Sequence, residues 1–343
     1  MNTTGSVGWG ILASGNIAHS FATDLQQLPD ARLVAVGSRR LESAEEFARE
    51  LPQRDGGTPR AYGSYEELAA DPDVDIVYVA SPHGLHHEHV RMLLEAGKPV
   101  LCEKALTLNA AQAEDLVALA AEKRLFLMEA MWMACHPLVR HLRERMQAGD
   151  FGQPRQLVAD LGWVVERPPT DRMLDPALGG GALLDMGIYP LTLAQLFLGD
   201  PAELTAVAHR APTGIDLNLV IAARYDGGAV AALTTSMTSN SPRTATIATG
   251  TGRLDFPAPF HHPSYVSWTA YHDGQPQQPQ RIVPPAPVIG TGLGNEAAEV
   301  MRCLRAGELE SPLVPHQQSL TLMRQMDSIR ATLGVVYPGE EPG

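Results

Sequence analysis

The first 130 residues alternate short apolar runs with amphipathic stretches, and this alternation restricts the fold more than any other feature of the sequence. Short apolar runs are typical of buried strands, and apolar residues three or four positions apart are typical of helices. Strands and helices in turn predict βαβ units, hence an α/β fold with a doubly wound parallel sheet. The predicted strands are 7–13, 32–36, 74–80, 100–102 and 125–128, and the predicted helices are 15–28, 41–51, 85–95 and 109–122.

After residue 150 the pattern changes to a block of strands, which predicts a second, α+β domain with an open, mostly antiparallel sheet. A chain of 343 residues is long enough for two domains, and we expect them at 1–130 and 131–343. Residues 257–287 are rich in Pro and Gln and are expected to form an ordered loop around one strand. The predicted strands are 156–165, 204–209, 217–225, 229–236, 245–249 and 265–271, and the predicted helices are 136–148, 183–197, 296–306 and 317–333.

The charge of the chain argues against some classes of partner. The sequence has 26 Lys and Arg residues against 39 Asp and Glu residues, a formal net charge of −13. Such acidity disfavours nucleic-acid phosphates and anionic membrane surfaces. The start has no basic and apolar leader, and we find no stretch of about 18 apolar residues that could span a membrane. Cys102, Cys135 and Cys303 form neither a disulfide framework nor a zinc cluster, so we expect a soluble, cytoplasmic protein.

The junction between the first predicted strand and helix, residues 13–18, reads ASGNIA. It matches the dinucleotide-binding fingerprint G-x-G-x-x-G/A of Rossmann domains, with alanine in the place of the first glycine. The second glycine would let the backbone approach a pyrophosphate, and the helix N-terminus supplies partial positive charge. A tight packing turn is the alternative. The candidate cofactor-binding residues here are Ala13, Gly15, Asn16 and Ile17.

The end of the second strand predicts which nicotinamide cofactor binds. NAD-specific sites carry Asp or Glu about 20 residues beyond the glycines, where the acid binds the ribose 2′-hydroxyl. This chain has Ser38, Arg39 and Arg40 there, without an acid. A serine and arginines suit a 2′-phosphate, so the sequence predicts NADP. The alternative is that both arginines only begin a solvated helix.

Polar residues also follow two further strands, at 81–83 and 103–104. Open α/β sheets bind ligands at the carboxyl ends of their strands. A metal site is an alternative for the neighbouring histidines, but His86, His87 and His89 cannot share one helix face and no carboxylate joins them at ligand spacing. We therefore expect no metal. The candidate cofactor contacts are Ser81, Pro82, His83, His86, Glu103 and Lys104.

Residues 179–189, GGGALLDMGIY, place Asp185 and Tyr189 four positions apart, on one face of a helix. Gly187 between them would allow a cofactor or another backbone to come close. A tyrosine with a pKa near 10 is a poor base at neutral pH unless a cation lowers its pKa. The chain has only three lysines, and Lys104 is the obvious cation. Lys104, Asp185 and Tyr189 are the predicted catalytic residues; a half-buried aromatic is the alternative for the tyrosine.

Together these segments resemble the Gfo/Idh/MocA oxidoreductase family across essentially the whole chain. Residues 103–105, EKA, are similar to the family's Glu-Lys-Pro motif, and residues 185–189, DMGIY, to its Asp-x-Gly-x-His motif. The tyrosine in place of histidine is similar to the branch of dimeric dihydrodiol dehydrogenases and NADP-dependent xylose dehydrogenases. Further segments similar to that branch are 128–132, 299–307, 310–315 and 335–338.

The resemblance implies that the lysine and the tyrosine form the catalytic pair, that Trp132 lies near the substrate, and that the open sheet supports a homodimer. With the residues above, it predicts an NADP-dependent dehydrogenase for a secondary alcohol or hemiacetal carbon of a sugar or cyclic diol. Tyr189 is the expected base, Lys104 its cationic partner and Asp185 an orienting residue. The candidate substrate contacts are Trp132, Arg172, Asp175 and Tyr189.

Two alternatives remain for the function. One is a reductase of a keto sugar such as 1,5-anhydrofructose, which would use the same groups in the reverse direction. The other is a non-catalytic regulator that binds NADP, although the presence of all three predicted catalytic residues argues against it.

Overall fold

The computed structural model describes residues 5–52 and 56–340, and its two main sheets lie in two compact units. The first unit spans Met1–Cys135 and Val288–Leu320, and the second spans His136–Pro287 and Thr321–Gly343. The first sheet is parallel and the second is mostly antiparallel, as the sequence predicted. The return of 288–320 to the first unit is a feature that the strand and helix periodicity did not predict.

All six strands of the first sheet are parallel, in the order β3-β2-β1-β4-β5-β6. The order reverses direction between β1 and β4, the switch point where doubly wound sheets bind ligands. β3 was not predicted because its three residues contain no apolar run. The strands are β1 (Val7–Leu12), β2 (Ala31–Gly37), β3 (Arg60–Tyr62), β4 (Ile76–Val79), β5 (Val100–Glu103) and β6 (Leu127–Ala130).

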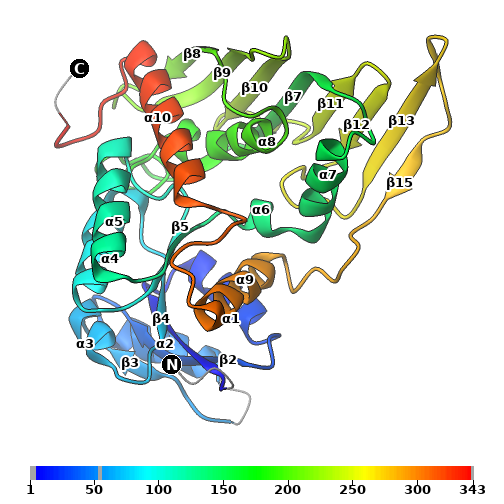
Figure 1. Ribbon diagram of the computed structural model, residues 1–343. Helices are drawn as coiled ribbons and strands as arrows, with labels where there is room; N and C mark the ends of the chain where they lie inside the picture. The colour runs from blue at the N-terminus through cyan, green and yellow to red at the C-terminus, as the bar shows by residue number, and fades with distance from the viewer. Residues whose placement is uncertain (1–4, 53–55, 341–343) are drawn as a thin grey trace. The chain divides into compact units, whose positions relative to one another are not determined.

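Helices cover both faces of this sheet: α4 and α5 lie side by side on one face, and α1 and α9 lie side by side on the other (Figure 1). The Asn109 side chain caps α5 as predicted, accepting a hydrogen bond of 2.9 Å from the Gln112 N–H. A 3₁₀ turn, His83–Leu85, leads into α4. The helices are α1 (Asn16–Leu25), α2 (Leu41–Glu50), α3 (Tyr65–Ala70), α4 (His86–Glu95), α5 (Ala110–Lys123), α6 (Trp132–Cys135) and α9 (Leu293–Ala306).

The second sheet runs in the order β14-β13-β12-β11-β7-β10-β9-β8, with β15 beside β13. Its pairs are antiparallel except β7 with β10. The prediction of a loop over 257–287 is wrong in part, because β14 and β15 pair with β13 there despite their few apolar residues. The strands are β7 (Pro154–Gly162), β8 (Glu203–Arg210), β9 (Asp216–Arg224), β10 (Val230–Ser236), β11 (Ala245–Thr249), β12 (Gly252–Phe256), β13 (Val266–His272), β14 (Gln275–Pro276) and β15 (Gln280–Ile282).

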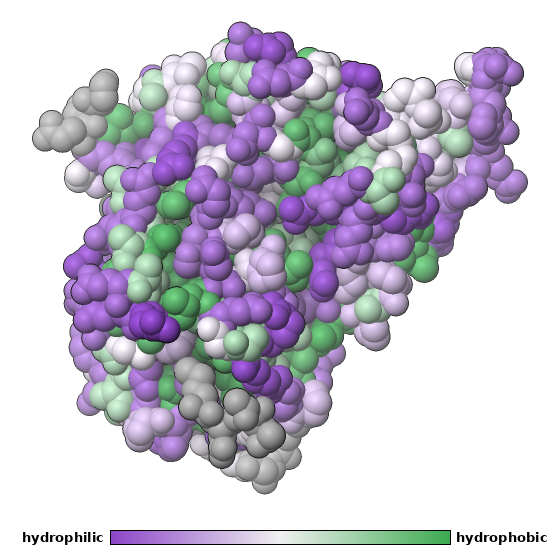
Figure 2. Space-filling model, viewed as in Figure 1, coloured by the Kyte–Doolittle hydropathy of each residue, from purple (hydrophilic) through white to green (hydrophobic). Residues whose placement is uncertain are grey.

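One face of the second sheet is covered by a buried helix, α8 (Ile188–Leu198), which packs on β7 and β10. The remaining helices are α7 (Pro137–Gln147) and α10 (His316–Leu333). Among the described residues, Pro176–Leu198 is long and apolar enough to cross a membrane, contrary to the expectation from the sequence. Its most apolar window is 89% buried, so it is a core helix that covers a sheet. Hydrophilic residues occupy most of the face seen in Figure 2.

Candidate active site

The predicted dinucleotide fingerprint lies between β1 and α1. Gly15 is the N-cap of α1, no side chain caps this end, and the first turn contains no acidic residue. A Cβ atom built on Gly15 would meet nothing within 4 Å, so the space in front of the helix is open. Ala13 has φ +76°, a left-handed conformation that costs a non-glycine residue about 1–2 kcal/mol. This conformation explains why the fingerprint has glycine at that position.

At the end of β2, Arg39 is exposed, and its charge acts on Tyr65 and His89. The rings of Tyr65 and His89 meet edge to face with centroids 4.7 Å apart. Burial lowers the pKa of His89 and the guanidinium of Arg39 lowers it further. Arg40 donates a 2.8 Å hydrogen bond to the Ser43 hydroxyl, and the Ser38 N–H donates to the Tyr62 carbonyl. Arg39 and Arg40 are thus exposed cations after the end of β2, where the sequence predicts the 2′-phosphate.

The histidines after β4 join the ends of β4 and β5. His86 has no exposed surface, and its ring nitrogens lie 2.9 Å from the Ala105 carbonyl and 2.7 Å from the Ser81 carbonyl. Burial lowers its pKa to about 3, so the neutral ring donates to only one of the two. His83 Nε2 lies 3.0 Å from the Lys104 carbonyl. These contacts hold the segment of Ser81 against the segment of Lys104.

No group of metal ligands occurs among the described residues, and His87 and His89 each have a protein partner. His87 Nε2 lies 2.7 Å from Asp115 Oδ2, and His89 Nδ1 lies 2.9 Å from the Ser81 hydroxyl.

The three lysines differ in their surroundings. Lys98 donates from Nζ to the Asp71 and Val74 carbonyls at 2.6 and 2.8 Å, which ties a loop to β5. Lys123 is exposed at the end of α5. Lys104 follows β5 directly, and its backbone N–H donates to Glu103 Oε2 at 3.3 Å. Lys104 is thus the lysine at the carboxyl edge of the parallel sheet.

In the second unit, Asp185 lies in a π-helical turn, Leu183–Gly187, and Tyr189 lies in the first turn of α8. Such turns within helices are frequent at functional sites. Arg172 donates from Nη1 to Asp185 Oδ1 at 3.1 Å, and both Asp185 and Tyr189 are almost fully buried. A Cβ atom on Gly187 would lie 3.1 Å from the Leu183 side chain of the same turn and in ordinary contact, at 3.7 Å, with Thr235 of β10.

Two residues that sequence reasoning missed lie next to Tyr189 and next to the π-helical turn of Asp185. The His261 ring packs on the Tyr189 ring with centroids 4.6 Å apart. Asp216 accepts a 2.6 Å hydrogen bond from the Leu183 N–H at the start of the π-turn, and burial raises its pKa to about 6. Asp175, a predicted substrate contact, caps a 3₁₀ turn by accepting from the Ala177 N–H at 2.9 Å. Sequence analysis did not select His261 because this residue lies in a proline-rich stretch and belongs to no recognisable motif.

The predicted residues thus fall into two groups, one in each unit. The first unit holds the fingerprint, the arginines after β2, the residues at the ends of β4 and β5, and Trp132 of α6. The second unit holds Arg172, Asp175, Asp185 and Tyr189. A described pocket of about 450 Å³ lies elsewhere, on the open face of the second sheet, and none of the predicted site residues lines it.

Two family models match the chain. Residues 7–131 match the Gfo/Idh/MocA oxidoreductase family, NAD-binding Rossmann fold, and residues 139–254 match a Gfo/Idh/MocA C-terminal domain.

Two dehydrogenases are similar to this chain over nearly its full length. The chain is 36% identical to the trans-1,2-dihydrobenzene-1,2-diol dehydrogenase of Oryctolagus cuniculus, over 96% of this chain and 100% of that protein. It is 37% identical to a D-xylose 1-dehydrogenase (NADP(+)) of Hypocrea jecorina, over 96% and 93% of the two chains. A crystal structure of a 3-ketoreductase from Actinomadura kijaniata, in complex with NADP and TDP-benzene, has a TM-score of 0.83 and 29% identity. That match covers 95% of this chain and 98% of the other.

Proposed function

The chain belongs to the Gfo/Idh/MocA oxidoreductase family, and we propose that it transfers a hydride between NADP(H) and a hydroxyl-bearing carbon of a sugar or cyclic diol. Its membership makes it an NAD(P)-dependent oxidoreductase. The observation that carries the finer proposal is the pair of motif residues, Lys104 directly after β5 and Tyr189 at the start of α8. The named activities of the relatives, on a diol and on xylose, support the substrate class.

The residues of the first unit fit a bound dinucleotide. The N-terminus of α1 presents backbone N–H groups to open space beside Gly15, where a pyrophosphate would be held. His86 is buried, so we propose that it acts on the cofactor through Ser81 and Ala105. The proposed binding residues are Ala13, Gly15, Asn16, Ile17, Ser38, Arg39, Arg40, Ser81, Pro82, His83, His86, Glu103 and Lys104.

The proton of the substrate hydroxyl needs an acceptor while the carbinol carbon loses its hydride. The bound nicotinamide supplies the hydride acceptor, or the donor in the reverse direction. We assign the proton to the phenol oxygen of Tyr189, with the Lys104 ammonium favouring the phenolate and donating a hydrogen bond to the substrate oxygen. Asp185, fixed by Arg172, orients the reacting groups. In reduction, Tyr189 returns the proton to the carbonyl oxygen.

The proposed substrate contacts combine polar and apolar groups. Arg172 and Asp175 can reach hydroxyl groups of a sugar or diol, and Trp132 offers an apolar wall for a ring. The imidazole ring of His261, which packs on the Tyr189 ring, is a further polar group next to the proposed base.

NADP is the proposed cofactor, and Arg39→Ala tests this choice. We expect the variant to bind NADP more weakly by about 1.5–3 kcal/mol, the contribution of a charged hydrogen bond, and to bind NAD unchanged. Fluorescence titration with NADPH and NADH measures both affinities, so NADH binding is the internal control. An equal loss for both cofactors would mean that Arg39 does not contact the phosphate.

A keto-sugar reductase is the second candidate function. The structural similarity to a 3-ketoreductase along almost the whole chain favours it. Absorbance at 340 nm, recorded with NADP and alcohols or with NADPH and keto sugars, separates the two directions. Tight NADPH binding without turnover on any substrate of such a panel would instead support the non-catalytic regulator.

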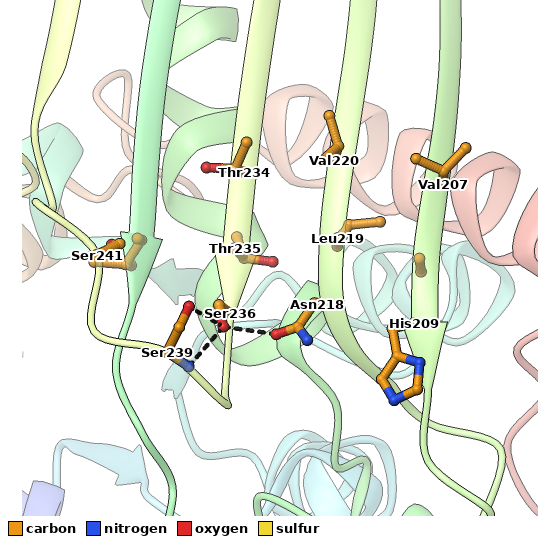
Figure 3. A pocket seen from close by; sticks show the side chains of 12 residues that line it. Val207, His209, Asn218, Leu219, Val220, Thr234, Thr235, Ser236, Ser239 and Ser241 are labelled. Carbon is orange, nitrogen blue, oxygen red and sulfur yellow. Dashed lines mark hydrogen bonds between the residues drawn. The ribbon is translucent and has the colours of Figure 1, made fainter.

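We propose a homodimer formed through the open face of the second sheet. Val158, Val207, Val220 and Val230 are each at least 45% exposed, on four neighbouring strands. Figure 3 shows Thr234, Val220 and Val207 side by side on three successive strands, and hydrogen bonds that join Asn218, Ser236 and Ser239 at one end of the strands. A row of exposed apolar side chains across neighbouring strands is typical of an interaction surface. A second copy of the chain is the occupant that the family resemblance supports.

Light scattering is expected to give a mass of twice 36.9 kDa for the protein. Val220→Glu should shift the mass to that of one chain, because two copies would bury like charges in one interface. Val283→Glu, an exposed valine outside this face, is the control and should leave the dimer intact. A monomeric mass for the unchanged protein at micromolar concentration would exclude the dimer.

We further propose that residues 1–130 act as the NADP-binding domain and 131–343 as the substrate-binding and dimerisation domain. The fingerprint and Lys104 fall in the first range, and Asp185, Tyr189 and the open sheet face fall in the second. The proposed location is the cytoplasm, where NADP(H) and sugars are both available.

A further inference from the structure

A buried carboxyl group without a hydrogen-bond partner lies beside the segment of Lys104. Glu296, in the first turn of α9, has no exposed surface, and neither of its carboxyl oxygens has a partner among the described residues. A buried, ionised carboxylate without donors is very costly, whereas the protonated form is tolerated. This side chain plays no part in the function proposed above.

The charges of two other buried carboxyl groups, Glu103 and Asp24, act on Glu296, and both groups have donors. Glu103 of β5 accepts hydrogen bonds from the Tyr78 hydroxyl and from the Lys104 N–H. Asp24 of α1 accepts from Thr291, from Leu293 at 3.1 Å and from Gly294 at 3.3 Å, and so caps α9. Donors stabilise the charged form of a carboxylate. The negative charges therefore belong on Glu103 and Asp24.

Two further elements, β4 and α6, carry no positively charged side chain. Tyr78 of β4 lies on the same sheet face as Glu103, under the Phe21 ring of α1 at 3.8 Å. Burial and the two glutamates hold the pKa of Tyr78 well above its usual range, so its hydroxyl stays protonated and keeps donating. α6 also packs on α9, and its only titratable side chain is Cys135. Burial, with Glu103 and Asp24, raises the pKa of Glu296 far above its usual range.

We propose that Glu296 is a positioning residue for Lys104: it keeps a proton, so that Glu103 next to it stays negatively charged and holds the Lys104 backbone N–H. This role depends on one part of the proposed function, namely that Lys104 is a catalytic residue. If Glu296 ionised, it would repel Glu103, and the Tyr78–Glu103–Lys104 contacts would lose their anchor.

If Glu296 keeps its proton in the folded protein, the free energy of unfolding must depend on pH. Unfolded Glu296 releases its proton above a pH of about 4.5, whereas the folded protein retains it, so rising pH favours unfolding by up to about tenfold per unit. Glu296→Gln carries no such proton. We expect the Tm of this variant to be higher than that of the unchanged protein. The difference in Tm should increase by up to about 3–5 °C per pH unit between pH 5.5 and 8.5.

Glu299→Gln, one turn further along α9, is the matched control. Burial would raise the pKa of Glu299, but hydrogen bonds from Arg302 and Ser311 lower it overall. Glu299 is therefore ionised in both the folded and unfolded states over this pH range. Its replacement should lower Tm by an amount that does not change with pH. A Tm gap for Glu296→Gln that is constant with pH would mean that Glu296 is ionised in the folded protein, and would overturn the proposal.

Glu103→Gln tests the link to Lys104. In a protein that carries Glu103→Gln, the Tm increase caused by Glu296→Gln should grow less with pH, because the negative charge next to Glu296 is gone. A Tm increase with the same pH dependence as before would mean that Glu103 does not act on Glu296 and would overturn the proposal. At pH 7, Glu103→Gln should lower kcat by about tenfold or more with a smaller effect on KM, since a neutral amide holds the Lys104 N–H more weakly. Unchanged kcat would remove the positioning role. The Tm measurements need no turnover, so they remain decisive if the proposed function fails.

Discussion

Replacing Lys104 with methionine is expected to lower kcat by at least about 10²–10⁴-fold, the usual contribution of acid–base catalysis. Methionine is unbranched and close in size to the apolar stem of lysine, but it carries no charge. In the proposed mechanism, the variant would lack the cation that favours the Tyr189 phenolate and a donor to the substrate oxygen. Steady-state kinetics at saturating NADP measure the effect, and Tm checks that the fold is kept.

Lys123→Met is the matched control, because this lysine is exposed at the end of α5 and should leave kcat unchanged. Lys98 is less suitable, since its ammonium bonds two backbone carbonyls and its loss should lower stability. A Lys104→Met enzyme with most of its kcat would contradict the proposed catalytic site.

The strongly periodic parts of the fold could be predicted from the sequence. The alternation of apolar runs and amphipathic helices identified the parallel sheet, and the Asn109 cap marked the start of α5 within one residue. β3 and β15 were missed because each has only three residues and pairs at the margin of a sheet. The parallel pairing of β7 with β10 could not be predicted either, because it joins segments about 70 residues apart in the sequence.

The candidate site could be predicted where a local motif carries it, and not where it depends on contacts between distant segments. Asp185 and Tyr189 share a motif, so their spacing was enough to propose both as site residues. Glu296 and His261 have no such motif: one meets Glu103 almost 200 residues earlier, and the other meets Tyr189 across a proline-rich stretch. Burial without a donor and ring packing are properties of the folded chain alone.

Tyr189→Phe is expected to lower kcat by about 10²–10⁴-fold, because phenylalanine keeps the ring and its packing on His261 but cannot take up the hydroxyl proton. NADPH binding, measured by fluorescence, should hardly change. Tyr265→Phe is the control in the same unit: it keeps the ring under the Arg281 guanidinium and should leave kcat as it is.

The double variant decides whether Lys104 and Tyr189 act as one catalytic unit. If the ammonium works by favouring the phenolate, then removing it from an enzyme that already lacks the phenol should cost little more. The combined loss in kcat should therefore be far smaller than the product of the two single losses. Multiplicative losses would mean that the two residues act independently. If Tyr189→Phe keeps most of its kcat while Lys104→Met is inactive, the lysine itself takes the proton, and the roles assigned to the two residues are wrong.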